Sequence, residues 1–117
     1  MNDVLQQLDR ILAQRRDADP DQSYVASLHQ AGLNKILEKV GEECVETILA
    51  AKESQTGDSH DDLIHETADL WFHCLVMLSH LGADSSQVLA ELKQRFDMSG
   101  LEEKASRGQA EEPAPGH

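Results

Sequence analysis

Hydrophobic residues recur three and four positions apart along almost every long segment of this chain, and no segment shows sustained alternation. Spacing of three and four places apolar side chains on one side of a helix, whereas alternation would indicate a strand. We therefore predict an all-α protein, built as a bundle of four to five helices. The first helix carries Val4, Leu5, Leu8, Ile11 and Leu12, and it fades at residues 15–18.

Capping residues divide the next part of the chain. Asp19 and Pro20 have the order of an N-cap followed by proline at the first helical position, which predicts a short second helix ended by Gly32. Asn34 is then expected to cap a third helix that ends before residue 56. Gly41 inside this helix costs about 1 kcal/mol relative to alanine, so we expect a close helix contact or a ligand there.

The second half of the chain contains two further helices. Ser59, three residues before Asp62, predicts the start of a fourth helix that runs to about residue 80 and stops at Gly82. The Asp-Ser-Ser sequence at residues 84–86 is expected to cap a last helix. We assign residues 1–108 to one folded domain and residues 109–117 to a disordered tail.

The fourth helix is expected to be the most buried, because apolar residues surround it except along one narrow stripe. At about 100° per residue, four polar side chains fall within about 60° of one another on that stripe. They are Asp62, Glu66, Asp69 and His73. Carboxylates on a buried helix need a compensating charge, which a metal ion or facing lysines would supply.

The third helix is expected to have a charged face and an apolar packing face. The charged face contains Lys35, Lys39, Glu42, Glu43 and Glu46, all within about 60° of Lys39. The opposite face contains Leu37, Val40, Cys44 and Ile48. Taken alone, the charged face is typical of a solvated surface, and only the acidic stripe on the fourth helix favours ligand binding.

Two acidic pairs carry the candidate chemistry, Glu43-x-x-Glu46 and Glu66-x-x-Asp69. Residues three apart lie one turn apart on the same helix face, so two pairs on facing helices direct four carboxylates at one point. Oxygen ligands favour Mg²⁺, with Mn²⁺ as a substitute. A di-iron bundle would show Glu-x-x-His twice, and neither pair has this histidine. His73, one turn beyond Asp69, is compatible with a core histidine and with a substrate contact.

The composition limits the classes of partner. A net charge of −12 over 117 residues argues against binding to a nucleic-acid backbone, whereas a metal ion can bridge acidic residues to a phosphate substrate. No apolar stretch approaches the roughly 20 residues of a membrane span, and no signal peptide is visible, so we expect a cytoplasmic protein. Cys44 and Cys74 lack metal-finger spacing and are expected to be buried, reduced thiols.

Several short motifs occur in an order that resembles one enzyme family. Ser23-Tyr24 precedes Lys35-Ile-Leu-Glu-Lys-Val-Gly-Glu-Glu-Cys-Val-Glu46-Thr, which is followed by Glu66-Thr-Ala-Asp69-Leu-Trp-Phe-His73. Over roughly residues 3–97 this set is similar to the phosphoribosyl-ATP pyrophosphatases, which are all-α, MazG-like nucleoside triphosphate pyrophosphohydrolases. Cys44 and Trp71 depart from the pattern of many relatives, but neither is a proposed ligand.

The resemblance implies hydrolysis of the α,β-phosphoanhydride of phosphoribosyl-ATP to phosphoribosyl-AMP and pyrophosphate, the second step of histidine biosynthesis. It also implies that Mg²⁺ is held by Glu43, Glu46, Glu66 and Asp69. Glu42 would be an extra ligand or would orient the attacking water, beside Glu43 and Glu46 as catalytic residues. The substrate phosphates would contact Lys35, Lys39 and His73.

Two alternative functions remain at this point. A house-cleaning triphosphate pyrophosphohydrolase would use the same acidic cluster with a different base pocket, and a non-catalytic helical interaction module would not use it. The long apolar faces leave a single copy thinly covered, and Trp71 and Phe72 point away from the acidic stripe. We therefore expect a homodimer whose helices complete the bundle, as the resemblance also implies.

Overall fold

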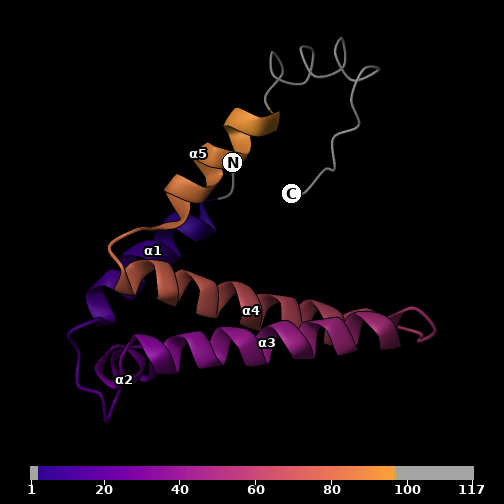
Figure 1. Cartoon of the computed structure of the whole chain (residues 1–117), viewed down its shortest axis with the longest axis horizontal. Coiled ribbons are helices and arrows are strands. Elements are labelled where there is room, and N and C mark those ends of the chain that lie inside the picture. The colour runs from indigo at the N-terminus through magenta and orange to yellow at the C-terminus, as the bar shows by residue number, and fades with distance from the viewer. Residues whose placement is uncertain (1–2, 97–117) are drawn as a thin grey trace. The chain divides into compact units, whose positions relative to one another are not determined.

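The computed structural model describes residues 3–96, and within them the chain forms five α-helices and no strand. They are α1 (Val4–Arg15), α2 (Tyr24–Ala31), α3 (Leu33–Ser54), α4 (Asp61–His80) and α5 (Ser85–Phe96), shown in Figure 1. The all-α prediction is confirmed. The proposed tail and the end of the proposed domain at residue 108 lie outside the described residues.

The chain divides into two compact units, Met1–Ser85 and Ser86–His117. The first unit contains α1 to α4, and the described part of the second is α5 from residue 86 onward. In the first unit, α3 and α4 lie side by side as a long helical hairpin (Figure 1), α1 packs on α4 and α2, and α2 packs on α3. The two helices with the acidic pairs are therefore direct neighbours.

The hydrophobic core of the first unit draws on all four of its helices. It consists of Leu12, Val25, Leu28, Ile36, Leu75 and Val76. Leu12, Ile36 and Val76 are fully buried. Because Ile36 lies near the start of α3 and Val76 near the end of α4, the core fixes one end of the hairpin.

The prediction that Asp19 and Pro20 begin the second helix is wrong. α2 begins at Tyr24, because the hydroxyl of Ser23 accepts a hydrogen bond from the backbone N–H of Ala26 at 3.1 Å. Asp19 instead accepts backbone N–H groups of the next turn through its carbonyl and its carboxylate. The Asp-Pro sequence therefore marks a turn, which such residues also favour.

The other predicted helix ends lie within one or two residues of the observed ones. Gly32 ends α2 at a φ of 104°, and α3 begins directly after it, so Asn34 is not the cap. Ser59 stabilises the start of α4 by accepting the N–H of Asp61 at 3.0 Å. Gly82, at a φ of 86°, follows α4 as expected.

α3 packs through a different stripe from the predicted one. Its buried residues are Ile36, Glu43 and Ala50, which are spaced by seven and so form one line along the helix. The face expected to pack leaves Leu37 43% and Ile48 62% exposed. The prediction that the apolar face packs is therefore wrong within one chain, because the neighbours of α3 cover the stripe that contains Glu43.

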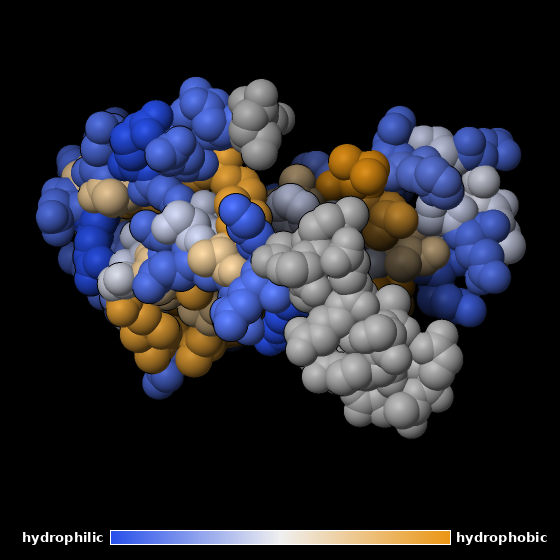
Figure 2. Space-filling view, turned by 90° about the horizontal axis from the view of Figure 1, so that it is seen from above, coloured by the Kyte–Doolittle hydropathy of each residue, from blue (hydrophilic) through white to orange (hydrophobic). Residues whose placement is uncertain are grey.

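α4 is likewise not the most buried helix of the single chain. Only three of its residues are buried, compared with four of the eight residues of α2. Ile64 is 64% exposed and Trp71 is 59% exposed. Residues of high hydropathy form orange groups on the surface in Figure 2. None of the described helices is long and apolar enough to cross a membrane.

The two cysteines are free thiols, as expected, but they are only partly buried. Burial raises the pKa of the Cys74 thiol, and the nearby Cys44 adds to this effect. A raised pKa favours the protonated thiol, which is the less reactive form.

A polar cluster joins the ends of α1, α2 and α4. The guanidinium of Arg16 donates to the carbonyls of Ser79 at 2.8 Å and His80 at 3.2 Å, at the end of α4 where a cation is favourable. The Nδ1 atoms of His29 and His80 are 2.9 Å apart, so one neutral ring donates its hydrogen to the other. His29 is buried, and this hydrogen bond ties α2 to α4.

This cluster predicts loss of stability in mild acid. Burial, followed by the nearby Arg16 and His80, lowers the pKa of His29 below 6.5. The stabilisation is therefore complete above the unfolded pKa of about 6.5 and is lost as the pH falls through the lower folded pKa. We expect the free energy of unfolding, measured with urea, to fall below about pH 6.5, and to fall less in His29→Asn. The same pH dependence in both proteins would contradict this explanation.

Candidate functional site

The α3–α4 hairpin brings three of the four predicted metal ligands together. Glu43 and Glu46 on α3 and Glu66 on α4 each offer a carboxylate oxygen, and these oxygens lie within 4.8 Å of one another. Glu43 is buried, Glu66 is partly buried and Glu46 is exposed, so the cluster opens toward solvent on one side. An aqueous ion and a phosphate can reach such a cluster.

Thr47 fixes the two helices at the level of this cluster. Its hydroxyl lies 2.7 Å from the carbonyl of Glu43 on its own helix and 3.1 Å from the carbonyl of Glu66 on α4. Threonine within a helix often donates to the carbonyl one turn earlier, and here the same hydroxyl also meets the neighbouring helix. Thr47 was given no role from the sequence, although its position directly after Glu46 in the motif could have indicated one.

The cluster concentrates negative charge where solvation is poor. Glu43 is only 7% exposed, and one carboxylate oxygen of Glu43 and one of Glu66 are buried without a hydrogen-bond partner among the described residues. Burial, then repulsion by Glu46 and Asp69, raises the pKa of Glu43. Burial and then Glu46 also raise the pKa of Glu66. Such carboxylates need a proton or a cation to balance them.

Asp69, the fourth predicted ligand, lies at the edge of the cluster. It is close enough to Glu43 to contribute to the raised pKa of that residue. Its carboxylate, however, lies 3.5 Å from Nε2 of His65, one turn earlier on α4. Sequence reasoning missed His65, which the four-residue spacing to Asp69 could have identified.

The predicted phosphate-binding lysines pair with carboxylates of their own helix. Lys35 lies 3.3 Å from Glu38, and Lys39 lies 3.2 Å from Glu42. The hydrogen bond to Glu42 is the main reason that the pKa of Lys39 is raised. These ion pairs therefore do not support the expectation that the two lysines compensate the acidic stripe of α4 directly.

The expected close helix contact at Gly41 is corrected by the geometry. An added Cβ at Gly41 would meet nothing within 4 Å, so no helix approaches this glycine in the described part of the chain. A ligand at Gly41 stays a prediction. Asp62, the first residue of the predicted acidic stripe, lines a pocket of about 270 Å³ at the turn between α3 and α4.

His73 is a buried histidine with both ring nitrogens engaged. Nδ1 lies 2.8 Å from the carbonyl of Asp69, and Nε2 lies 2.9 Å from the hydroxyl of Tyr24. Because a carbonyl only accepts, Nδ1 carries the hydrogen in the neutral ring and the Tyr24 hydroxyl donates to Nε2. Tyr24 belongs to the Ser-Tyr motif, but sequence reasoning gave it no role.

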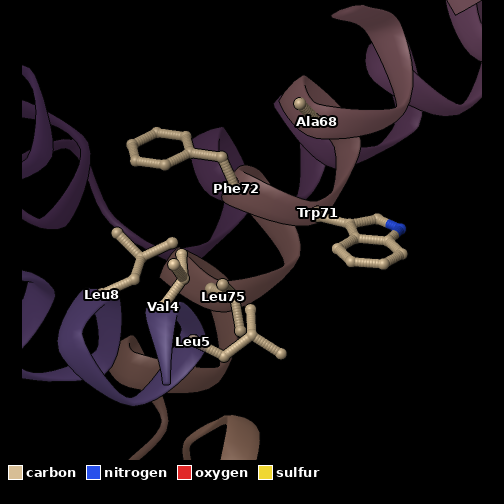
Figure 3. A pocket seen from close by; sticks show the side chains of 7 residues that line it. All are labelled: Val4, Leu5, Leu8, Ala68, Trp71, Phe72 and Leu75. Carbon is tan, nitrogen blue, oxygen red and sulfur yellow. The ribbon is translucent and has the colours of Figure 1, made fainter. Parts of the chain in front are cut away.

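A second pocket, of about 420 Å³, lies between α1 and α4 (Figure 3). It is lined by Val4, Leu5, Leu8, Ala68, Trp71, Phe72 and Leu75. Apart from the indole N–H of Trp71 these side chains are apolar, so the lining residues include no charged group that would hold a cation. We therefore assign the candidate chemistry to the acidic cluster.

The charge of Glu43 is poorly solvated and repelled by its neighbours. We therefore predict that a variant without this charge is more stable when no metal is bound. Because the pKa of Glu43 is raised, its favourable contribution exists below the unfolded pKa and is lost as the pH rises through the folded pKa. At about pH 7 the Glu43→Gln variant should melt higher in EDTA, by about 4–8 °C for each kcal/mol relieved. Glu38→Gln, at an exposed position of α3, should change little. A lower melting temperature for Glu43→Gln would contradict the prediction.

Most of the chain matches a known enzyme family. Residues 5–96 match the family described as phosphoribosyl-ATP pyrophosphohydrolase. The matched segment begins in α1, ends with α5, and contains the acidic cluster, both lysines and the Tyr24–His73 pair. Since it covers most of the chain, this protein belongs to the phosphoribosyl-ATP pyrophosphohydrolase family, hydrolases of histidine biosynthesis.

Proposed function

We propose that this chain cleaves phosphoribosyl-ATP into phosphoribosyl-AMP and pyrophosphate, by attack of water on the α,β-phosphoanhydride beside a divalent cation. Membership of the family supports the substrate and the reaction class. The observation that supports the cation is a pair of buried carboxylate oxygens on Glu43 and Glu66, next to Glu46, for which residues 3–96 provide no hydrogen-bond partner. A cation would supply the missing partner for both oxygens.

The donor set fits Mg²⁺, with Mn²⁺ as a substitute, because its atoms are carboxylate oxygens. Glu43, Glu46 and Glu66 would hold the ion, and Asp69 would join them by turning away from His65. That exposed pairing is weak, so little free energy opposes the turn. When bound, the ion supplies charge neutralisation of the triphosphate and makes nearby water more acidic.

Glu42 is the residue that we assign to the attacking water. It is exposed, lies outside the three-carboxylate cluster, and keeps a carboxylate that can accept a proton from water. Without substrate it pairs with Lys39 at 3.2 Å, and it would be released when Lys39 turns to a phosphate. Glu46 of the cluster lies one turn later on the same side of α3, so water held by Glu42 would be close to the cluster.

The lysines are suited to exchange their present partners for substrate phosphates. The pairs Lys35–Glu38 and Lys39–Glu42 lie at the helix surface with spacing of three, and such pairs contribute only about 0.2–1 kcal/mol. A polyphosphate offers each ammonium a higher negative charge than one carboxylate does. The lysines would thus stabilise the charge that develops on the leaving pyrophosphate. His73 is close to Glu43, but both of its ring nitrogens are engaged, so we assign it to holding the site rather than to the predicted phosphate contact.

The proposed chemistry predicts a selective loss of activity. Glu66→Gln keeps the size of the side chain but removes a ligand charge, so the rate of pyrophosphate release from phosphoribosyl-ATP should fall about 100-fold or more. Glu38→Gln should keep activity within about twofold, because Glu38 only pairs with Lys35 at the surface.

The same assay distinguishes a house-cleaning enzyme. Wild-type protein should prefer phosphoribosyl-ATP over a panel of ordinary nucleoside triphosphates, and EDTA should abolish the rate until Mg²⁺ is restored. A chain that hydrolyses the panel equally well would refute the proposed substrate. Full activity in EDTA would refute the proposed cation.

We also propose that the enzyme is a homodimer. On α3, Val45, Ile48 and Leu49 occupy one face and are each more than half exposed, and on α4 Ile64 and Trp71 are exposed as well. Contiguous apolar surface of this kind is uncommon on monomers. A second copy that covers these faces would complete the helical bundle.

The dimer predicts a mass of about twice 12.9 kDa in size-exclusion chromatography with light scattering. Ile48→Glu should shift the protein toward the monomer, because it would bury a charge in the interface. The matched substitution Gln14→Glu, at an exposed polar position of α1, should leave the mass unchanged. A wild-type monomer at micromolar concentration would rule out the proposed dimer.

A further inference from the structure

Beyond the carboxylates, a chain of hydrogen bonds leads from α2 to the backbone of Asp69. The hydroxyl of Tyr24 donates to Nε2 of His73, and Nδ1–H of His73 donates to the carbonyl of Asp69. These bonds measure 2.9 Å and 2.8 Å, which are good distances for such groups. The His73 ring is consequently held at both ends, in one tautomer.

Aromatic packing fixes the direction of the Tyr24 hydroxyl. The Tyr24 ring stacks on Phe72 with centroids 6.3 Å apart and an interplanar angle of 18°. The rings of Tyr24 and Phe72 both meet His73 edge-on, at centroid distances of 5.9 Å and 5.2 Å. The three rings therefore restrict one another, and the hydroxyl has little freedom to leave Nε2.

The Tyr24 side chain also belongs to the neighbourhood of the proposed phosphate site. It contributes to the raised pKa of Lys39, after the larger effect of Glu42. His73, in turn, is close enough to lower the pKa of Glu43 partly back toward its ordinary value. Tyr24 is thus near a proposed phosphate ligand, and its hydrogen-bond partner is near a proposed metal ligand.

A purely structural role explains the position of Tyr24 less well. The residue is 51% exposed, so it adds little buried area to the core. Its hydroxyl would be satisfied by water if it pointed outward, and a part-buried hydrogen bond contributes little to stability. The bond is instead directed at the one ring nitrogen of His73 that is not bonded to its own helix.

We propose that Tyr24 is a positioning residue, which acts through His73 to hold this ring and the Asp69 segment in the orientation required for phosphoanhydride hydrolysis. The proposal rests on the proposed function, because it assigns Tyr24 to that same site. Tyr24 itself transfers no proton and binds no metal. The His73 ring and the turn of α4 that contains Asp69 are thus ordered before substrate binds, so less ordering is needed when the reaction begins.

The test is a double-mutant cycle with Tyr24→Phe and His73→Asn. Tyr24→Phe keeps the aromatic packing and removes only the hydroxyl, and we expect kcat to fall about tenfold with little change in KM. His73→Asn keeps a donor near the Nδ1 position but lacks Nε2. Adding Tyr24→Phe to His73→Asn should therefore lower kcat no further.

The control is Ser27→Ala, which removes another hydroxyl from α2, one that donates to the carbonyl of Tyr24. It should keep the wild-type kcat. A wild-type kcat in Tyr24→Phe would overturn the positioning role. So would an equal loss of kcat with and without His73, since the effect would then not act through that ring.

A measurement without substrate separates the two proposals. In protein with ¹⁵N-labelled histidine at about pH 8, where an ordinary histidine is neutral, NMR should show the His73 hydrogen on Nδ1. Tyr24→Phe should alter the His73 ring signals and leave those of His65 unchanged. A hydrogen on Nε2 in the wild type would overturn the positioning role. Inability of the wild type to hydrolyse phosphoribosyl-ATP would instead overturn the proposed function.

Discussion

Glu43 lies on the stripe of α3 that is buried within the chain, between Ile36 and Ala50, which are spaced seven residues to either side. A hydrophobic residue there would stabilise a simple helical hairpin, but the carboxylate instead loses solvent and meets Glu46 and Glu66. The fold tolerates this charge because other contacts hold α3 and α4 together, among them the Thr47 hydroxyl and the apolar core at one end of the hairpin. Stability is thereby reduced at the position where a cation would restore it, as is common at functional sites.

The same packing leaves apolar surface on the outside of the hairpin. With the Glu43 stripe buried, the apolar face of α3 that includes Ile48 points away from the single-chain core. One copy of the chain therefore provides the acidic cluster, and the uncovered faces are the surface on which we propose that a second copy packs. The stripe of α3 that is buried against its own chain thus determines two things. It places the acidic cluster, and it decides which apolar face is left for the proposed second copy.

Periodicity predicted the five helices well, because helix formation depends on local spacing that a sequence displays directly. It failed where a neighbour decides the outcome. Ser23, and not Asp19, caps α2, and the two could not be distinguished because both sequences suit a turn and a cap. The helical wheel found the apolar face of α3, but a wheel does not show which neighbour will cover it. Glu43, Glu46 and Glu66 were predicted from their spacing, and the spacing of His65 to Asp69 carried a similar signal. The bond of Tyr24 to His73, by contrast, is a three-dimensional contact that single motifs do not encode.

We propose that the buried carboxylates of α3 and α4 hold a divalent cation. Anomalous diffraction from crystals grown with Mn²⁺ tests this directly, because Mn²⁺ accepts the same oxygen ligands as Mg²⁺. We expect a peak between Glu43, Glu46 and Glu66, next to the carboxylate oxygens that have no hydrogen-bond partner within residues 3–96. Strong manganese peaks elsewhere, with this cluster empty, would contradict it.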